Sequence, residues 1–259
     1  MPWLAEFTLF GAPSTLIAAL VSVLLVGLSK GGLGGAFALI GVPVLALVMP
    51  PVQAAALLLP VLLMMDAVSL WAWRGFYDRV LLRLMLPSAI VGIAVGAMAA
   101  AFTSDAMVRL LVGIVALVFV AREVAWKSLA VSAPEHRPWL AWICGTAAGF
   151  TSFVAHAGGP PFQIYAMPLR LDPRVFTGTS VIFFAVVNLI KVLPYAALGQ
   201  FDKATLMSGL LMLPLAVVAT LMGAAIVKRM RSAVFYPFMY AMIALVSVKL
   251  IWDGLTGLL

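Results

Sequence analysis

Two lysines and a histidine interrupt otherwise apolar runs of this chain, and each needs a chemical explanation. Lys30 lies in the stretch GLSKGGLGG, residues 27–35, in which five of nine residues are glycine. Lys191 lies inside the apolar run 175–198, and His156 comes shortly before a second glycine pair. A lysine at the centre of a membrane helix costs about 2.5–3.5 kcal/mol on insertion scales. Such a charge therefore requires a partner, a route to the interface or a ligand.

Each of these three explanations stays open for the lysines. Asp66, in the apolar run 52–73, is the acid available to pair with one lysine, which would leave the other over. Either lysine could instead extend its charged end to the membrane interface. The excess of positive charge, together with helix N-termini after each break, favours the third explanation, a small anion as ligand.

His156 and a set of uncharged polar residues extend this candidate site. Because histidine titrates near neutral pH, His156 is a candidate anion contact or proton-coupling group, although a hydrogen bond to a loop carbonyl would also explain it. Hydroxyl groups in membrane helices also serve simply to hold helices together. The candidate polar liners are Gln163, Ser69, Thr177, Thr179, Ser180 and Asn188, with Tyr165 and Tyr195 as weaker ones. The glycines that would let a ligand approach the backbone are Gly31, Gly32, Gly34, Gly158 and Gly159.

The elements that must position these residues are helices in a membrane. Of the 259 residues, 65% are hydrophobic and 10% are charged, whereas soluble domains average about 45–50% and about 25%. The apolar runs are continuous rather than alternating, which favours helices over a β-barrel. One cysteine and two histidines make a metal site unfavourable, and we expect no cofactor. The net charge of +7 is explained by the basic residues that cytoplasmic loops carry and that set the orientation of a membrane protein. We therefore expect no nucleic-acid partner.

Each half of the chain is predicted to contain a broken helical hairpin followed by three membrane spans. The first half has hairpin arms at 13–29 and 34–49, and spans at 52–73, 80–101 and 106–123. The second half has a helix at 139–155, a short arm reaching Leu171, and spans at 175–198, 204–226 and 233–252. The short arm would reach only about 15 Å, half of the hydrocarbon core, so this hairpin is predicted to be re-entrant. For the first hairpin, two full spans remain an alternative.

Basic residues predict the orientation in the membrane. The loops 74–83, 122–138, 170–174 and 227–232 hold eleven lysines and arginines, whereas the opposite side holds Arg109, Lys203 and Lys249. The positive-inside rule places these four loops in the cytoplasm and both termini in the periplasm. The N-terminal segment lacks a basic leader, so the first apolar run is expected to be retained. The predicted inner aromatic belt is Trp71, Trp73, Trp126, Trp139 and Trp142, and the outer belt is Trp3 and Trp252.

This orientation makes the two halves inverted repeats, 1–123 and 139–259, joined by a cytoplasmic linker at 124–138. Glycine pairs recur in both halves, and GFYD at 75–78 is echoed by GQFD at 199–202, each just after the first long span of its half. Inverted repeats with interrupted helices are typical of secondary transporters with a site near the membrane midplane.

These motifs resemble a known family. GLSKGGLGG followed by GVPVLAL and GFYD, and GTAAGFTSFVAHAGGPP followed by TGTS and GQFD, are similar to the two repeats of the sulfite exporter TauE/SafE family of bacterial membrane proteins. The resemblance covers nearly the whole chain. It implies the transport, mostly the export, of sulfite, sulfonates or related anions. The matching motif residues are Lys30, Gly31, Gly32, Gly34, Gly158, Gly159, Pro160 and Pro161, whereas His156 departs from a glycine expected from the family.

The sequence thus predicts a multi-pass secondary transporter in the bacterial cytoplasmic membrane that exports a small sulfur oxyanion or organosulfur anion by alternating access. The alternative is a proton-coupled transporter of another organic acid or of a zwitterionic metabolite, with Asp66 and His156 as proton relays. We expect no enzymatic activity and no catalytic residue, because Ser29 beside Lys30 only imitates a nucleophile and base. The expected partners are a small anionic substrate, membrane lipid and a second copy in a homodimer.

Overall fold

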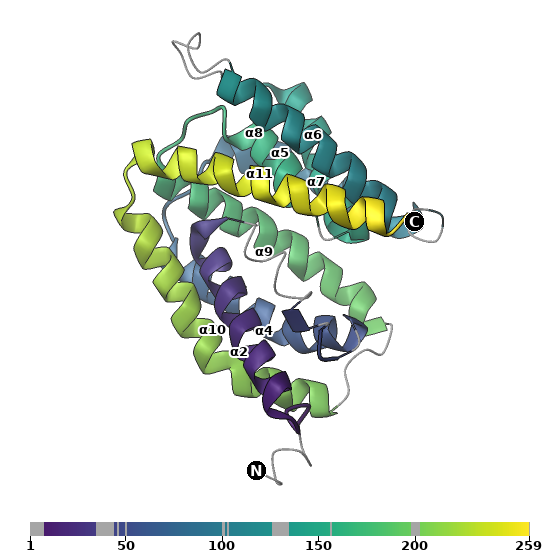
Figure 1. Ribbon diagram of the computed structural model, residues 1–259. Coiled ribbons are helices and arrows are strands. Elements are labelled where there is room, and N and C mark those ends of the chain that lie inside the picture. Colours follow the sequence, from purple (N-terminus) through teal and green to yellow (C-terminus); the bar gives the residue numbers. More distant parts are fainter. Residues whose placement is uncertain are drawn as a thin grey trace. The chain divides into compact units, whose positions relative to one another are not determined.

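The computed structural model describes residues 8–34, 44–45, 47–49, 51–99, 102, 104–125, 135–155, 157–197 and 203–258. All the regular secondary structure in these residues is helical (Figure 1), which confirms the predicted all-α class. The elements are α2 (Pro13–Leu28), η1 (Ser29–Leu33), α4 (Pro51–Ala72), α5 (Arg79–Ala99), α6 (Asp105–Ala125), α7 (Pro138–Ala155), α8 (Gly159–Ala166), α9 (Pro173–Ala197), α10 (Lys203–Arg229) and α11 (Ser232–Thr256).

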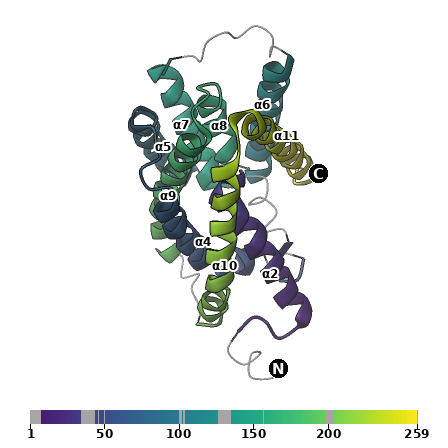
Figure 2. The same ribbon diagram turned by 90° about the vertical axis from the view of Figure 1, so that its left-hand side faces the viewer.

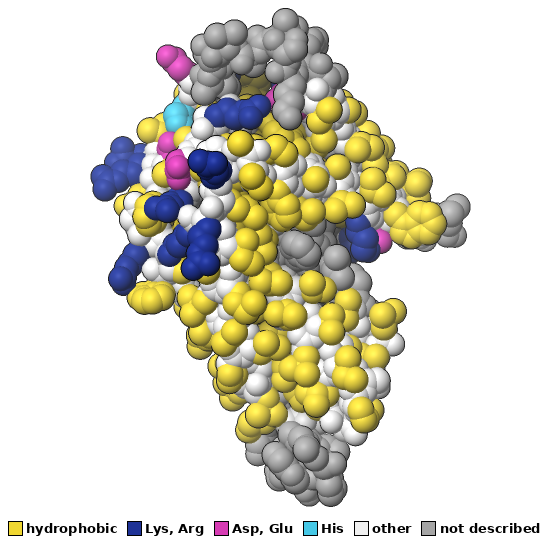
Figure 3. All heavy atoms as spheres, turned by 60° about the vertical axis from the view of Figure 1, so that its left-hand side comes forward, with side chains coloured by type: hydrophobic (Ala, Val, Ile, Leu, Met, Phe, Trp, Pro, Cys, Tyr) yellow, Lys and Arg dark blue, Asp and Glu magenta, His cyan; other side chains and the backbone are white. Residues whose placement is uncertain are grey.

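Several helical stretches have the length and apolar character of membrane spans. Within the described residues five of them qualify, namely Pro13–Leu33, Arg79–Ala99, Pro173–Ile190, Met207–Arg229 and Ser232–Thr256. About 20 residues of α-helix cross the hydrocarbon core. Hydrophobic side chains also cover most of the face seen in Figure 3, while Lys and Arg side chains gather in one region of it. The chain is therefore a multi-pass membrane protein.

Proline marks the beginning of several of these helices. Pro13, Pro51, Pro138 and Pro173 are the first residues of α2, α4, α7 and α9. Proline suits this position because the amide hydrogen it lacks would have no intrahelical partner there, and its fixed φ is already helical. The predicted helix boundaries consequently lie within a few residues of the observed ones. The exception is the first arm, which was predicted to end near residue 29 but continues through η1 to Leu33.

The described chain divides into two compact units that do not follow the two sequence halves. Unit 1 comprises Met1–Arg74 and Lys191–Arg229, and unit 2 comprises Gly75–Ile190 and Met230–Leu259. The boundary in the second half falls inside α9. A sequence repeat need not be a compact unit, so the predicted division into 1–123, 124–138 and 139–259 stays a prediction about repeats.

In unit 1, helix α10 packs against both α2 and α4, and Figures 1 and 2 both show α2 beside α10. The contact with α2 has small residues on both sides: Gly27 faces Ala219, and Gly31 faces Gly223. Small residues allow close approach of helix backbones, which is how membrane helices gain packing energy without a hydrophobic driving force. Buried apolar side chains of α2, α4 and α10 form the core of this unit, including Val23, Val26, Leu58, Met65 and Ala216.

In unit 2, the helix pairs α5–α7 and α6–α11 pack along their lengths. The first pair joins two Gly-x-x-x-Gly motifs. A Cβ atom added at Gly92 of α5 would overlap the backbone of Thr146, and one added at Gly149 of α7 would overlap the backbone of Ala89. The second pair likewise has a glycine on each helix. This dense glycine packing fixes α7, which carries the second helix break, to α5.

The short arm predicted in the second half is present as α8, an eight-residue helix that packs against α7. A helix of this length extends about 12 Å, which is too short to cross a bilayer. The second arm predicted for the first half, 34–49, lies almost entirely outside the described residues. Whether either hairpin re-enters the membrane stays a prediction.

Candidate functional site

The first helix break is built around glycine. Helix α2 passes into η1, a wide π-helical turn, and Gly32 inside this turn has φ 127° and ψ 0°. Gly34, which follows it, has φ 90°. L-residues rarely adopt either conformation, so glycine is required at both positions. The hydroxyl of Ser29 donates a hydrogen bond to the carbonyl of Gly34 and closes the turn.

One face of α4 supports the broken segment. The hydroxyl of Ser69 donates to the carbonyl oxygen of Lys30 at 2.8 Å, and the indole N–H of Trp73 donates to the carbonyl oxygen of Gly31 at 3.0 Å. Asp66 lies on the same face, because residues three and seven positions apart line up along a helix. A break in a helix leaves carbonyls without intrahelical donors. The side chains of Ser69, on α4, and of Trp73, directly after α4, satisfy two of them.

Lys30 and Asp66 form a buried ion pair. The Lys30 Nζ lies 2.6 Å from Asp66 Oδ1, and the two side chains are 16% and 8% exposed. The sequence interpretation in which Asp66 pairs with one of the two lysines is therefore confirmed for Lys30. Ser29 donates its hydrogen bond to Gly34 and Lys30 pairs with Asp66, so the two neighbouring side chains are not arranged as a nucleophile and its base. The four first-half site residues Lys30, Gly31, Gly32 and Gly34 are thus brought together with Asp66 in unit 1.

Trp73 is not the interfacial belt residue that the sequence predicted. Its ring is 1% exposed, its N–H is bonded to Gly31, and the Lys228 ammonium lies 5.3 Å from the ring centroid. A buried indole N–H needs an acceptor, and the helix break offers one. The predicted belt residue Trp71, two positions earlier, is 60% exposed.

The second helix break lies at the end of α7. The N–H of Ala157 donates to the carbonyl of Thr151 at 3.0 Å, and the Thr151 hydroxyl donates to Ala157 O at 3.2 Å. Gly158 packs against the last turns of α7, where a Cβ atom would meet Ala148 and Ser152. At Gly159, by contrast, an added Cβ would have nothing within 4 Å in the described part of the chain. His156 lies outside the described residues.

The remaining predicted residues occur on α8 and α9. Gln163 of α8 is buried. Ser180 and Asn188 of α9 are partly buried, and Lys191 lies in the last turns of the same helix. The hydroxyl of Thr177, on α9, is buried and has no hydrogen-bond partner among the described residues. In unit 1 the same holds for the hydroxyl of Thr220 on α10, a residue that the sequence interpretation did not select.

The repeated Gly-x-x-Asp motif has a structural explanation in the first half. Asp78 immediately precedes α5, and its Oδ1 accepts a hydrogen bond from the N–H of Leu81 at 2.8 Å. This is the geometry of a helix N-cap. In the second half, Asp202 lies outside the described residues. The first copy of the motif therefore marks the start of a helix.

Asp78 also belongs to a polar cluster that the sequence did not reveal. His136 Nε2 lies 3.4 Å from Asp78 Oδ2, and His136 Nδ1 lies 3.2 Å from the hydroxyl of Tyr165 on α8. The backbone N–H of Asp78 donates to Thr179 on α9. Segments from four parts of unit 2 meet here, so no local spacing could have predicted it. Thr179 and Tyr165, proposed as site liners, are engaged in this cluster.

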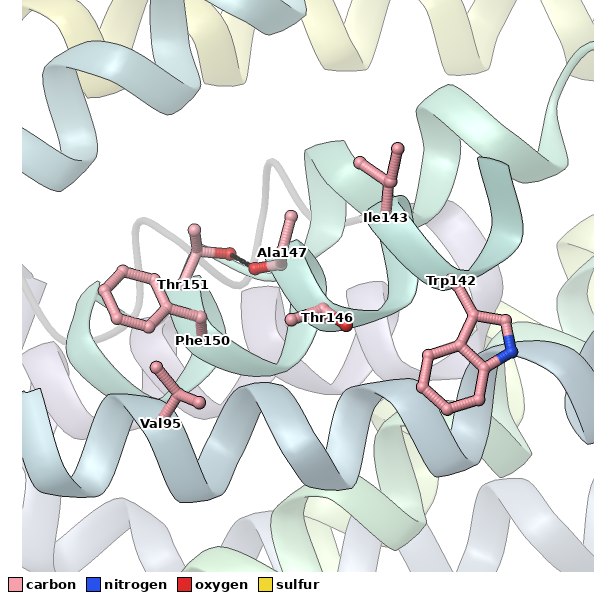
Figure 4. A pocket seen from close by; sticks show the side chains of 7 residues that line it. All are labelled: Val95, Trp142, Ile143, Thr146, Ala147, Phe150 and Thr151. Atoms are coloured by element: carbon pink, nitrogen blue, oxygen red, sulfur yellow. Dashed lines mark hydrogen bonds between the residues drawn. The ribbon is translucent and has the colours of Figure 1, made fainter. Parts of the chain in front are cut away.

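Two hollows among the described residues are lined by none of the predicted site residues. One, of about 560 Å³, is an apolar groove along α5 and α7 (Figure 4), lined by Val95, Trp142, Ile143, Thr146, Ala147, Phe150 and Thr151. The other, of about 300 Å³, lies between α6 and α11 and includes Glu123, Arg170 and Tyr240. In the groove, the Thr151 hydroxyl is already bonded to the Ala147 carbonyl, so it offers little to a polar ligand.

Chemically, the first break offers a lysine that is paired with Asp66, and a backbone whose glycines adopt conformations that other residues rarely adopt. Within the described residues, no group of three or more His, Cys, Asp or Glu side chains could hold a metal ion.

Comparison with known proteins identifies the family of the chain. The family model of the sulfite exporter TauE/SafE family matches residues 19–250. A search among curated proteins and a search among solved structures each returned no match. The matched range includes both helix breaks and all the helices from α4 to α10, so the chain belongs to the sulfite exporter TauE/SafE family and is a membrane transporter of small anions rather than an enzyme.

Proposed function

We propose that this protein exports a small sulfur oxyanion or organosulfonate across the cytoplasmic membrane by alternating access. The observation that carries the proposal is the buried Lys30 charge, held at a glycine-rich helix break by one face of α4. A positive charge inside a membrane protein is costly, and such charges usually mark a substrate pathway. Sulfite and sulfonates are compact anions that suit a lysine and backbone N–H groups as ligands.

The proposal also assigns the second break to anion binding. Gly158 is the N-cap and Gly159 the first residue of α8, and the N-terminus of a helix carries partial positive charge. Because Pro160 and Pro161 lack amide hydrogens, the backbone N–H groups at this end are those of Gly158 and Gly159. An anion could approach Gly159 closely, because no described atom occupies the position of a Cβ there. Lys191 supplies a further positive charge. The liners proposed beside them are His156, Gln163, Ser180 and Asn188.

Three helix contacts agree with the inverted repeats on which alternating access depends, whereas the α4–α10 contact has no comparable α9–α5 counterpart among the described residues. If the halves are repeats, α2 corresponds to α7, α10 to α5, and α11 to α6. Helix α2 packs on α10 in unit 1, and α7 packs on α5 in unit 2, while α6 packs on α11. Exchanging the halves turns the α2–α10 contact into the α7–α5 contact, and it turns the α6–α11 contact into itself. Two equivalent arrangements of opposite orientation are what a carrier needs to expose one site to each side in turn.

The first test is transport by purified protein in liposomes loaded with sulfite, sulfoacetate or thiosulfate. We expect the wild type to move at least one of these anions, and Lys30→Ala and Lys191→Ala each to reduce the initial rate at least tenfold. The matched control is Lys249→Ala, because Lys249 pairs with Asp253 on α11 outside the proposed site. Wild-type rates in both variants would refute the site, and no anion movement by the wild type would refute the function.

A further inference from the structure

We infer that Asp66 and the transported anion compete for Lys30, so that each anion is carried together with one proton taken up by Asp66. This inference rests on the proposed function. It assigns Asp66 to coupling and makes the ion pair the resting form of the site. The pair is close enough for a direct hydrogen bond, at 2.6 Å, and both side chains are largely buried.

The charge balance of the Lys30–Asp66 pair leads to this assignment. Lys30 and Asp66 together have no net charge, so an anion added to an intact pair would leave one buried negative charge. Such a charge is strongly unfavourable away from water. A proton on Asp66 removes it, because the neutral carboxyl group releases Lys30 and the lysine then pairs with the anion instead.

Among the described residues, the helices packed around Asp66 have few other titratable groups. Asp66 is the one charged residue of α4, and α2 has none. Helix α10, which packs on α4, has Lys203, Lys228 and Arg229 as its charged residues. Of these, Lys228 lies over the ring of Trp73. Lys30, from η1, contacts the Asp66 carboxylate directly.

The cycle follows from this exchange. A proton from the water on the entry side binds the Asp66 carboxylate, and the anion binds the released ammonium of Lys30. After the site opens to the other side, the anion and the proton both leave, and the Lys30–Asp66 ion pair forms again. A monoanion carried in this way moves without net charge. Transport should therefore respond to a pH gradient and not to the membrane potential.

The rival arrangement leaves the ion pair intact and uses Lys191 to neutralise the anion. In that case a monoanion would cross as a net charge. A potential of 100 mV would then change its equilibrium ratio about fiftyfold, and no proton would accompany it. The two arrangements thus differ in a measurable stoichiometry.

The experiment uses a singly charged organosulfonate, methanesulfonate, and measures anion flux, proton flux and potential dependence in the same liposomes. For the wild type we expect about one proton per monoanion and no response to an imposed potassium-diffusion potential. For Asp66→Asn we expect anion exchange to persist while proton flux falls at least tenfold, since Lys30 is permanently released. The matched control, Asp253→Asn in the α11 pair, should keep the wild-type stoichiometry.

A charge-reversed pair distinguishes a coupling role of Asp66 from a purely structural one. The double variant Lys30→Asp with Asp66→Lys keeps an ion pair, so we expect a similar melting temperature but loss of anion transport. Wild-type flux in this double variant, potential-driven flux without protons, or unchanged proton flux in Asp66→Asn would each overturn the coupling role. Absence of any anion exchange in the wild type would instead refute the proposed function.

Discussion

At the scale of single residues, Trp73 fixes the broken segment to α4 through one hydrogen bond. Its indole N–H donates to Gly31 O at 3.0 Å, and its ring is fully enclosed. A buried carbonyl that loses its donor costs about 1–3 kcal/mol. The bond therefore stabilises a backbone conformation that the glycines alone would leave undefined, since glycine resists ordering more than any other residue.

We predict that Trp73→Phe lowers the free energy of unfolding by about 1–3 kcal/mol, because the Gly31 carbonyl loses its donor while most of the ring remains. The melting temperature in detergent measures the effect. The matched control is Trp71→Phe, since Trp71 is 60% exposed and should change the melting temperature little. Equal losses in both variants would show that the hydrogen bond to Gly31 does not stabilise the break.

The sequence offers an ion pair with Asp66 as one of three explanations for its two lysines. It does not decide which lysine contacts Asp66, and it does not predict the hydrogen bonds around the pair. Trp73 has two chemically sensible positions, at the interface or within the protein, because one end of its ring is polar and the other apolar. Only the packing of α4 against η1 decides between them. The Asp78–His136–Tyr165 cluster could not be predicted from the sequence either, because its members come from separate segments.

At the scale of elements, glycine determines how closely helices α5 and α7 approach. Gly92 on one helix and Gly145 and Gly149 on the other leave no space for a methyl group at their contact. Van der Waals packing is the main gain available to helices that are already surrounded by lipid. Because α7 ends at the second helix break, this contact also fixes where that break lies within unit 2.

We predict that Gly149→Ala destabilises the protein by about 1–3 kcal/mol, as overpacked cores do, because its Cβ would overlap the carbonyl of Ala89. Thermal unfolding in detergent measures this loss. Ala97→Val on the exposed face of α5 adds volume without a helix contact and serves as the control. If the melting temperature of Gly149→Ala equals that of the wild type, the close α5–α7 contact is incorrect.

Helix positions were predictable because their signals are local. Proline at the first turn, glycine at the breaks and runs of about 20 apolar residues each constrain a few neighbouring positions. The continuation of α2 into η1 was not predictable, since glycine normally ends a helix. There the turn is held by Ser69 and Trp73, which lie some forty residues away in sequence.

At the scale of the whole molecule, the charges define one end of the bundle in unit 2. The contacts Asp78–His136 and Arg174–Phe76 gather three of the segments that the sequence assigned to cytoplasmic loops, and Arg170 contacts Tyr236 near the start of α11. These three segments, 74–83, 122–138 and 170–174, come from separate parts of the chain, yet they lie together. Their common position is what the positive-inside rule requires if all of them face the cytoplasm.

The topology itself can be tested with single cysteines, because the chain has one native cysteine, Cys144, which is buried. In a Cys144→Ala background, we predict that Glu135→Cys, in the exposed segment before α7, reacts with a membrane-impermeant maleimide only after the membrane is opened. Leu258→Cys, 52% exposed after α11, should react in intact cells. α11 begins at the charged end of unit 2, and a span of 25 residues is long enough to carry its end to the opposite side. Labelling of Glu135→Cys in intact cells would mean that the transporter has the opposite orientation in the membrane. Labelling of both positions from one side would mean that α11 does not cross the membrane.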